Sequence, residues 1–347
     1  IVAETIAFEI PLKKVTENIS VLELFHGPTL AFKDVGARFM SRCLGYFLKN
    51  ETRKVTVLVA TSGDTGGAVA NGFYDVEGIE VVILYPKNRV SPVQEKQLTA
   101  LGKNIHALEV NGSFDDCQAL VKQAFSDESL NEKLLLTSAN SINVARWLPQ
   151  QIYYVLALKQ WLKNNSENPV ICVPSGNFGN ICAGILAHHR GLPVEHFIAA
   201  CNVNDVVPEY LRTEILKPKE TVATISNAMD VGDPSNFVRI LELFDKEFNQ
   251  VKNKLSGYTI DDEETLKTIE RVEKDYGYVL DPHGAVAFVA LEKYLTENDG
   301  KGFFLETAHP VKFPDSVEQA TGKSVEIPKS LEELMKQEKF TTEINPQ

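Results

Sequence analysis

Residues 55–68 read Val-Thr-Val-Leu-Val-Ala-Thr-Ser-Gly-Asp-Thr-Gly-Gly-Ala. The first six are apolar or β-branched without polar alternation, which is typical of a strand covered on both faces in a parallel sheet. The run stops at a turn of glycines and small hydroxyl residues, where glycine lets the backbone bend sharply. A helix that follows such a turn presents backbone N–H groups to an anion. An ordinary strand–helix turn of small residues has the same pattern, so both interpretations stay open here.

Similar apolar runs recur along the chain, separated by segments with helical spacing. The runs occupy residues 81–85, 169–173, 196–200 and 302–305, and the helical segments occupy residues 114–125, 143–162, 262–276 and 282–295. Repeated strand–helix alternation predicts an α/β protein built from open, mainly parallel sheets covered by helices.

The length of 347 residues suggests two domains. A polar stretch at residues 163–169 is a candidate crossover between two lobes. We therefore expect a smaller lobe at residues 34–163, inserted into a larger lobe formed by residues 1–33 and 164–347.

Charge and cysteine content limit the binding partners and the cellular compartment that we expect for this protein. The net charge of −12 argues against a nucleic-acid or anionic-membrane partner, which requires a basic face. No apolar run reaches the length of a membrane span. Five cysteines without a CxxC pair indicate neither disulfides nor a zinc site, so we expect no metal and a reducing, cytoplasmic compartment. The chain begins at Ile1 rather than Met, and we expect that an N-terminal region of the natural protein is missing.

A second turn follows the strand at residues 169–173 and reads Pro-Ser-Gly-Asn-Phe-Gly-Asn over residues 174–180. Its glycines and the expected helix after it suit a phosphate group. The nucleotide-binding patterns Gly-Lys-Ser/Thr and GxGxxG are both absent from this turn. The turn therefore predicts a phosphate that is not part of a nucleotide.

The third segment, residues 25–34, reads Phe-His-Gly-Pro-Thr-Leu-Ala-Phe-Lys-Asp. Lys33 stands among apolar neighbours, and a desolvated lysine favours its neutral amine. A neutral amine is what a Schiff-base nucleophile requires. The alternative is a surface lysine whose stem lies along apolar residues while its charge stays in water.

These segments together resemble a known family. His26-Gly27-Pro28-Thr29 with Phe32-Lys33-Asp34 is similar to the lysine segment of threonine synthases, within the tryptophan-synthase-like, fold type II enzymes that use pyridoxal 5'-phosphate (PLP). Residues 62–66 resemble that group's carboxylate loop and residues 175–180 its phosphate loop. Thr307-Ala308-His309-Pro310 resembles the place where a hydroxyl meets the pyridine nitrogen. The likeness covers nearly the whole chain and is closest to the bacterial and fungal branch.

The resemblance implies a role for each segment. Lys33 holds PLP and moves protons, and Thr307 faces the ring nitrogen. The cofactor phosphate is held by Gly176, Asn177, Phe178, Gly179 and Asn180. The substrate carboxylate and the cofactor's phenolic oxygen are met by Ser62, Gly63, Thr65 and Asp64.

Asp64 departs from the pattern of many relatives outside this branch, which have Asn there. A carboxylate beside a phenolate is unfavourable unless one of the two carries a proton. We therefore expect Asp64 to be partly protonated or turned away. His283, at the start of an apolar helix, is expected to be a capped structural histidine.

Residues 137–146, Thr-Ser-Ala-Asn-Ser-Ile-Asn-Val-Ala-Arg, resemble the family's grip on the phosphate of O-phosphohomoserine. The expected donors are Asn140, Ser141, Asn143 and Arg146. They are expected at a helix N-terminus, and arginine makes forked contacts to phosphate. The alternative is an ordinary helix cap followed by a surface arginine.

The implied activity is conversion of O-phospho-L-homoserine and water to L-threonine and phosphate, by elimination and β-hydration on PLP. A related PLP phospho-lyase or a serine/threonine dehydratase is the alternative on this fold. The donors around Arg146 argue against a dehydratase but do not separate synthase from lyase. A phosphate-binding module without catalysis is a third possibility, against which Lys33 counts. We expect a monomer or weak homodimer.

Overall fold

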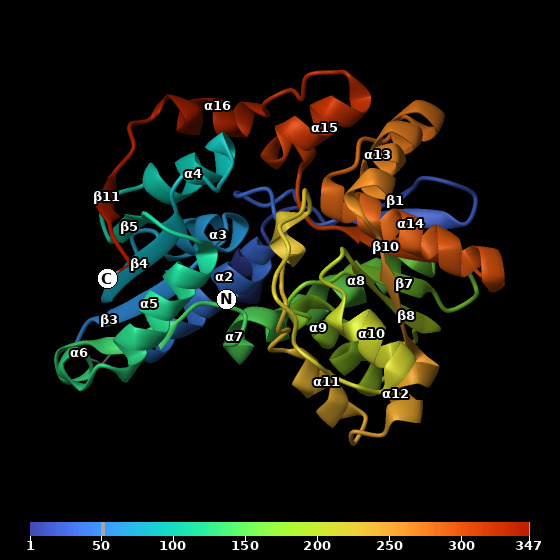
Figure 1. Ribbon diagram of the computed structural model, residues 1–347, viewed down its shortest axis with the longest axis horizontal. Helices are drawn as coiled ribbons and strands as arrows, with labels where there is room; N and C mark the ends of the chain where they lie inside the picture. The colour runs from blue at the N-terminus through green and yellow to red at the C-terminus, as the bar shows by residue number, and fades with distance from the viewer. Residues whose placement is uncertain (50–52, 347) are drawn as a thin grey trace. The chain divides into compact units, whose positions relative to one another are not determined.

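The computed structural model describes residues 1–49 and 53–346 (Figure 1). The chain forms two compact units. Unit 1 comprises Ile1–Phe8, Gly27–Arg146 and Glu326–Gln347, and unit 2 comprises Glu9–His26 and Trp147–Val325. Each unit has its own sheet and its own core, as the strand–helix alternation predicted.

Unit 1 contains a five-stranded sheet with the order β11-β5-β4-β3-β6, in which all neighbours are parallel. The strands are β3 (Val55–Ala60), β4 (Ile79–Pro86), β5 (Ile105–Val110), β6 (Leu135–Ser138) and β11 (Thr341–Ile344). Its helices are α1 (Val2–Thr5), α2 (Lys33–Phe47), α3 (Asp64–Phe73), α4 (Pro92–Thr99), α5 (Phe114–Ser126), α6 (Glu128–Lys133) and α16 (Lys329–Lys336). Helix α7 (Val144–Trp147) ends at the boundary of the unit.

Strand β3 is buried along its whole length, which explains its unbroken apolar run. Val57 and Val59 pack with side chains of α2 and α3, whereas Leu58 packs with α5 on the opposite face. Helix α5 begins where the sequence predicts, because the Ser113 hydroxyl accepts the Asp116 N–H. Covering on both faces is the reason that a parallel strand needs no polar side.

Unit 2 contains a six-stranded sheet with the order β1-β2-β10-β7-β8-β9, in which only the β1–β2 pair is antiparallel among the described residues. The strands are β1 (Leu12–Lys14), β2 (Ile19–Glu23), β7 (Val170–Pro174), β8 (His196–Cys201), β9 (Leu255–Thr259) and β10 (Gly302–Glu306). The α-helices are α8 (Gln151–Trp161), α9 (Gly179–His189), α10 (Val206–Thr213), α11 (Phe237–Leu243), α12 (Phe248–Lys254), α13 (Asp262–Tyr276), α14 (Pro282–Glu297) and α15 (Pro314–Thr321). Short 3-10 helices occupy η1 (Leu148–Gln150), η2 (Asn227–Met229) and η3 (Pro310–Lys312).

The core of unit 2 lies between α14 and the middle of the sheet. Apolar side chains of α14 pack with Val170, Ile198 and Phe304 from neighbouring strands.

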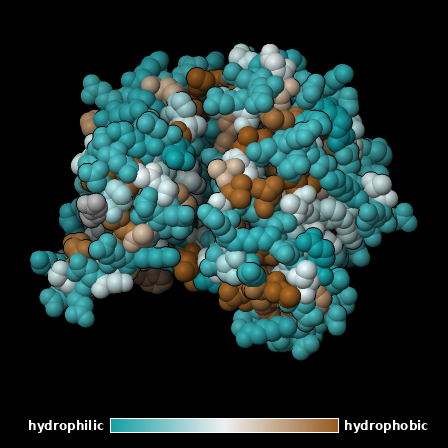
Figure 2. All heavy atoms as spheres, viewed as in Figure 1, coloured by the Kyte–Doolittle hydropathy of each residue, from teal (hydrophilic) through white to brown (hydrophobic). Residues whose placement is uncertain are grey.

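Hydrophilic side chains predominate on the face drawn in Figure 2, where apolar side chains appear in small groups. No helix within residues 1–49 and 53–346 is long and apolar enough to cross a membrane.

The boundaries of the units differ from the expected lobes. Residues 27–33 lie in unit 1 because they lead directly into α2, which packs on α3. Residues 147–163 lie in unit 2 because α8 packs on α9. The C-terminal segment returns to unit 1, where β11 pairs with β5. Pairing between residues so distant in sequence leaves no local pattern, so the lobe boundaries could not be drawn from composition.

Candidate active site

Lys33 is the first residue of α2, and its side chain is only 16% exposed. Its Nζ lies 3.8 Å from Asp64 Oδ2 and 5.6 Å from the centroid of the Phe32 ring. An amine this enclosed differs from the surface lysine considered as the alternative. The geometry therefore favours a lysine that meets a ligand.

The start of α2 is held by Asp34, which is fully buried. Its carboxylate accepts the Thr29 N–H at 2.9 Å and the Thr29 hydroxyl at 2.5 Å. A Cβ on Gly27 would come within 2.4 Å of Asp34 Oδ2, so only glycine lets the turn close around this carboxylate. The turn before Lys33 is therefore rigidly tied to the helix that carries Lys33.

The turn after β3 is stabilised by Thr61, whose hydroxyl oxygen accepts the N–H groups of Gly63 and Gly66, both at 2.9 Å. Gly63 has φ = 137°, a backbone conformation that residues other than glycine rarely adopt. Ser62 and Thr65 are half-buried on the same turn. The sequence predicted the hydroxyls of Ser62 and Thr65 as donors and missed the structural role of Thr61.

Asp64 is the first residue of α3 and is 5% exposed. Its Oδ1 accepts the Gln94 Nε2–H at 2.9 Å, while its Oδ2 faces Lys33. An N–H donor, a lysine and a helix N-terminus all favour the charged form of a carboxylate. Asp64 Oδ2 thus faces Lys33, while its protonation and its orientation toward the cofactor's phenolic oxygen stay predictions. Sequence reasoning missed Gln94, because its capping-box spacing to Ser91 predicts a helix start and no further contact.

Asn140 and Asn143 bind the backbone of their own unit. Asn140 Nδ2 donates to Ala60 O at 2.8 Å, and Asn143 Nδ2 donates to Ser138 O at 3.0 Å. The helix that follows, α7, has only four residues, so its N-terminus is weaker than the expected helix would provide. Ser141 beside them is half-buried. Their arrangement pins residues 138–146 to the end of β3.

Arg146 is 3% exposed, which rules out the surface arginine of the alternative interpretation. Its Nη1 donates to Ala139 O. Burial lowers the pKa of Arg146 to about 10, and the nearby Asp34 carboxylate acts in the opposite direction. A guanidinium with that pKa is still charged at neutral pH.

In unit 2 the predicted phosphate turn lies between β7 and α9. Phe178 adopts the left-handed conformation with φ = 61°, and α9 begins at the next residue. The first N–H groups of a helix have no acceptor within the helix. A Cβ on Gly176 would come within 2.6 Å of Met229 Cα, so the turn lies against η2 with no space for a side chain.

Asn180 supplies a further donor at this turn. It is buried, and its Oδ1 accepts the Tyr154 hydroxyl at 2.6 Å. Its Nδ2 has no hydrogen-bond partner in the part of the chain that the structure describes. Because an unsatisfied buried donor is costly, this atom indicates a missing acceptor. An acceptor-only group such as phosphate fits the set of donors.

Two residues that the sequence did not single out hold Asn177. Its Oδ1 accepts the N–H of Ser235 at 2.7 Å and the Ser235 hydroxyl at 2.9 Å. Its backbone oxygen accepts Asn236 Nδ2–H at 2.9 Å. The sequence marks residues 233–236, Asp-Pro-Ser-Asn, as a turn, but nothing in that pattern connects them to residue 177.

Thr307 directly follows β10 and is 6% exposed. Because β10 and β7 are parallel neighbours, Thr307 and the turn after β7 extend from the same edge of the sheet. Beside them, His283 is buried; its Nδ1 lies 2.5 Å from Asp281 Oδ1 and its Nε2 accepts the Ala228 N–H at 3.1 Å. These contacts agree with the structural role expected for His283.

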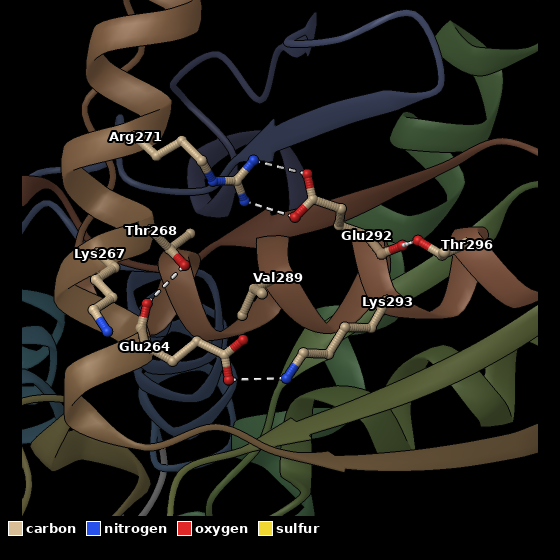
Figure 3. A pocket seen from close by; sticks show the side chains of 8 residues that line it. All are labelled: Glu264, Lys267, Thr268, Arg271, Val289, Glu292, Lys293 and Thr296. Atoms are coloured by element: carbon tan, nitrogen blue, oxygen red, sulfur yellow. Dashed lines mark hydrogen bonds and ion pairs between the residues drawn. The ribbon is translucent and has the colours of Figure 1, made fainter.

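A separate hollow of about 450 Å³ lies between α13 and α14 (Figure 3). Its cations face carboxylates: Arg271 Nη2 lies 2.6 Å from Glu292 and Lys293 Nζ 2.8 Å from Glu264. It therefore offers little uncompensated charge to a ligand. Elsewhere among the described residues, no group of three or more His, Cys, Asp or Glu side chains is arranged to hold a metal ion.

Comparison with known proteins identifies the family. Residues 9–302 match the family described as pyridoxal-phosphate dependent enzyme, and residues 284–347 match the C-terminal domain of threonine synthase. The chain is 49% identical over 331 residues to the threonine synthase of Haemophilus influenzae, covering 95% of this chain and 77% of that protein. The chain belongs to the threonine synthase family. The Escherichia coli threonine synthase is 50% identical over 328 residues, with 94% and 75% of the two chains covered.

Solved structures agree with this family. A crystal structure of threonine synthase from Escherichia coli superposes with a TM-score of 0.92 at 47% identity, over 100% of this chain and 80% of that one. A PLP-bound threonine synthase from Brucella melitensis gives a TM-score of 0.92 at 36% identity, over 99% and 80%. The predicted fold class, family and cofactor are thereby confirmed.

Proposed function

We propose that Lys33 carries the cofactor and that the turn at residues 176–180 holds the cofactor phosphate in the reaction that this family catalyses. The chain is a PLP-dependent lyase that converts O-phospho-L-homoserine and water to L-threonine and phosphate. Its substrate is a small molecule. When bound, PLP supplies an electron sink for negative charge on the substrate's carbon atoms. The chain's own residues supply binding, orientation and proton transfer.

The phosphate assignment depends on one observation above all, the buried Asn180 Nδ2 without a partner among the described residues. Tyr154 holds the other end of this amide, so the N–H cannot turn away without losing that contact. The N-terminus of α9 adds backbone donors on the same turn. The absence of a side chain at Gly176 keeps the turn close to η2.

Lys33 is proposed to accept and return protons at the substrate's carbon atoms through Nζ. Its position at the start of α2 is fixed by the Asp34 contacts with Thr29. The carboxylate of Asp64 faces Nζ at 3.8 Å and orients the amine. A general acid–base group works best when it is held in one geometry.

The substrate carboxylate is assigned to the turn before α3, where Ser62, Gly63 and Thr65 lie. The ten-residue helix α3 supports an anion at this end. We assign the hydroxyl of Thr307 to the ring nitrogen, where a neutral partner leaves the ring less electron-poor than a carboxylate would.

The substrate phosphate is assigned to Asn140, Ser141, Asn143 and Arg146. Support comes from the charge of Arg146, since a pKa of about 10 keeps it protonated. Arg146→Ala should weaken binding of phosphorylated substrate by about 1.5–3 kcal/mol, the value of one charged hydrogen bond. The Michaelis constant and the free energy of unfolding are measured together. A variant that is destabilised but keeps its Michaelis constant would make Arg146 purely structural.

The reaction itself is tested by supplying O-phosphohomoserine and PLP and identifying the products. Threonine and phosphate in equal amounts are expected. A keto acid in place of threonine would instead indicate the alternative phospho-lyase or dehydratase outcome. Lys33→Ala serves as the control that removes turnover without removing the phosphate turn.

We further propose that the protein is cytoplasmic and is a monomer or a weak homodimer. The five cysteines at residues 43, 117, 172, 182 and 201 are unpaired in the structure, which agrees with a reducing compartment. Sedimentation at several protein concentrations measures the oligomeric state, and a stable tetramer would contradict the proposal.

A further inference from the structure

Gln94 is buried against the turn that carries Asp64. It is the third residue of α4 and is 1% exposed. Its Oε1 accepts the Ser91 N–H at 3.1 Å, and its own N–H donates to the Ser91 hydroxyl at 3.3 Å. This capping box uses the amide oxygen of the Gln94 side chain and leaves the Nε2 donor for another partner.

That partner is Asp64. Gln94 Nε2 donates to Asp64 Oδ1 at 2.9 Å, and the other carboxylate oxygen lies 3.8 Å from Lys33 Nζ. The amide lies so close to the turn that a Cβ on Gly63 would come within 2.4–2.6 Å of its atoms. A continuous set of contacts thus runs from the cap of α4 through Gln94 and Asp64 to Lys33.

We propose that Gln94 is a positioning residue, which holds the Asp64 carboxylate so that Oδ2 faces the lysine that carries the cofactor. The inference rests on the proposed function of Lys33. The torsion about the last bond of an aspartate is broad, so a carboxylate needs a donor to define its plane. A neutral amide supplies that donor without a second positive charge, which would compete with Lys33 for the carboxylate.

Gln94→Glu isolates this contact from the capping role. Glutamate keeps the oxygen that caps α4, since both glutamate and glutamine serve at this position of a capping box. It replaces the donor that faces Asp64 by an oxygen, so the two carboxylates repel. Ser91→Ala is the matched control, because it removes the hydroxyl half of the cap and keeps the Gln94–Asp64 hydrogen bond.

The measurement is the dissociation constant of PLP, followed by the visible absorption of the cofactor bound to lysine, with thermal unfolding recorded in parallel. Gln94→Glu is expected to weaken PLP binding by about tenfold or more, as for loss of one hydrogen bond to a charged group. Ser91→Ala is expected to lower the melting temperature and leave the PLP dissociation constant unchanged. The reverse pattern would reduce Gln94 to a helix cap and overturn the proposal.

A double-mutant cycle with Asp64→Asn tests whether the effect passes through Asp64. An asparagine at that position can donate to the introduced glutamate, so Q94E should cost less PLP affinity in the D64N background. Equal losses in both backgrounds would contradict a route through Asp64. If Q94E does not fold, Gln94→Met removes the donor without adding charge and is measured in the same cycle.

The two proposals fail in different ways. If the unaltered chain gives no visible band with PLP, the assignment of Lys33 is wrong. If the unaltered chain gives the band and Q94E binds PLP equally well, only the role of Gln94 is refuted.

Discussion

The turns that precede α3 and α9 have the same strand–turn–helix design but opposite chemistry. The turn before α3 contains its own acceptors, because Thr61 accepts two backbone N–H groups and Asp64 accepts the Gln94 amide. Helix α9, by contrast, has no acidic residue in its first turn. The Asn180 Nδ2–H there has no partner among the described residues. The turn before α3 thus uses two of its N–H groups within the chain, which leaves its side-chain hydroxyls as the donors assigned to the substrate carboxylate. A turn with donors left over suits a phosphate that stays bound.

The largest effect is expected at Lys33, which the first turn faces through Asp64. Lys33→Ala should abolish the visible band of bound cofactor and lower turnover by at least about 10²–10⁴-fold, the range for loss of a general acid–base group. Absorbance and steady-state rates measure the two effects. Lys33→Arg keeps a positive charge beside Asp64 and is expected to be equally inactive. Full activity in either variant contradicts the assignment.

The next effect tests the second turn. Asn180→Asp keeps an oxygen for the Tyr154 hydroxyl but replaces the unpaired donor by a negative charge. PLP affinity should fall by about 1.5–3 kcal/mol or more, because a charged hydrogen bond is lost and repulsion is added. Equilibrium titration of the chain with PLP measures it. Tyr154→Phe, which merely releases the amide, is the milder control; an unchanged affinity in Asn180→Asp would remove the phosphate from this turn.

In the turn before α3, a substitution should lower the stability of the protein and leave PLP affinity largely unchanged. Thr61→Val keeps the shape of the side chain and leaves the buried N–H groups of Gly63 and Gly66 without their acceptor. The free energy of unfolding should fall by about 1–3 kcal/mol, the cost of an unsatisfied buried group. Chemical denaturation measures this, and PLP affinity should change little. A loss of PLP affinity with unchanged stability would erase the distinction between the two turns.

The smallest effect is expected at Thr307. Thr307→Val removes one neutral hydroxyl from the ring nitrogen, and the activation free energy should rise by about 0.5–1.5 kcal/mol. Turnover should therefore suffer more than folding, which thermal unfolding checks. Thr307→Ser restores the hydroxyl and should recover most of the rate. Wild-type kinetics in the valine variant would refute the role.

Much of the fold followed from local patterns. The run at 55–60 is β3, the segment capped by Ser113 is α5, and Pro149 lies within the 3-10 helix η1 directly before α8. Six strands were not predicted: β1, β2, β5, β6, β9 and β11. Three of them, β1, β6 and β11, have only three or four residues, which carry too little periodicity. The expected lobe boundaries differ from the units for a related reason: β11 joins its sheet by pairing with residues 107–110, which lie far away in the sequence.

The residues of the candidate site also differ in whether the sequence could reveal them. Lys33 and both glycine turns were recognisable because each is a contiguous motif, in which residues adjacent in the sequence determine the chemistry. Gln94, Tyr154 and Ser235 were not, since each is separated from its partner by 26 to 58 positions in the sequence. The hydrogen bond that holds Asp64 was missed for the same reason, because its donor, Gln94, lies on another helix.

By itself, the amino-acid sequence determined which groups are available: an amine after an apolar turn, two strand–turn–helix junctions and a hydroxyl after the last apolar strand. Only the tertiary structure decided which donors are already used and which remain for a ligand. Satisfying a buried hydrogen bond is a property of the packed surroundings, and those are assembled from residues far apart in the chain. Thr61 and Asn180 are both polar residues at such junctions, yet packing makes one a structural acceptor and leaves the other with a donor to offer.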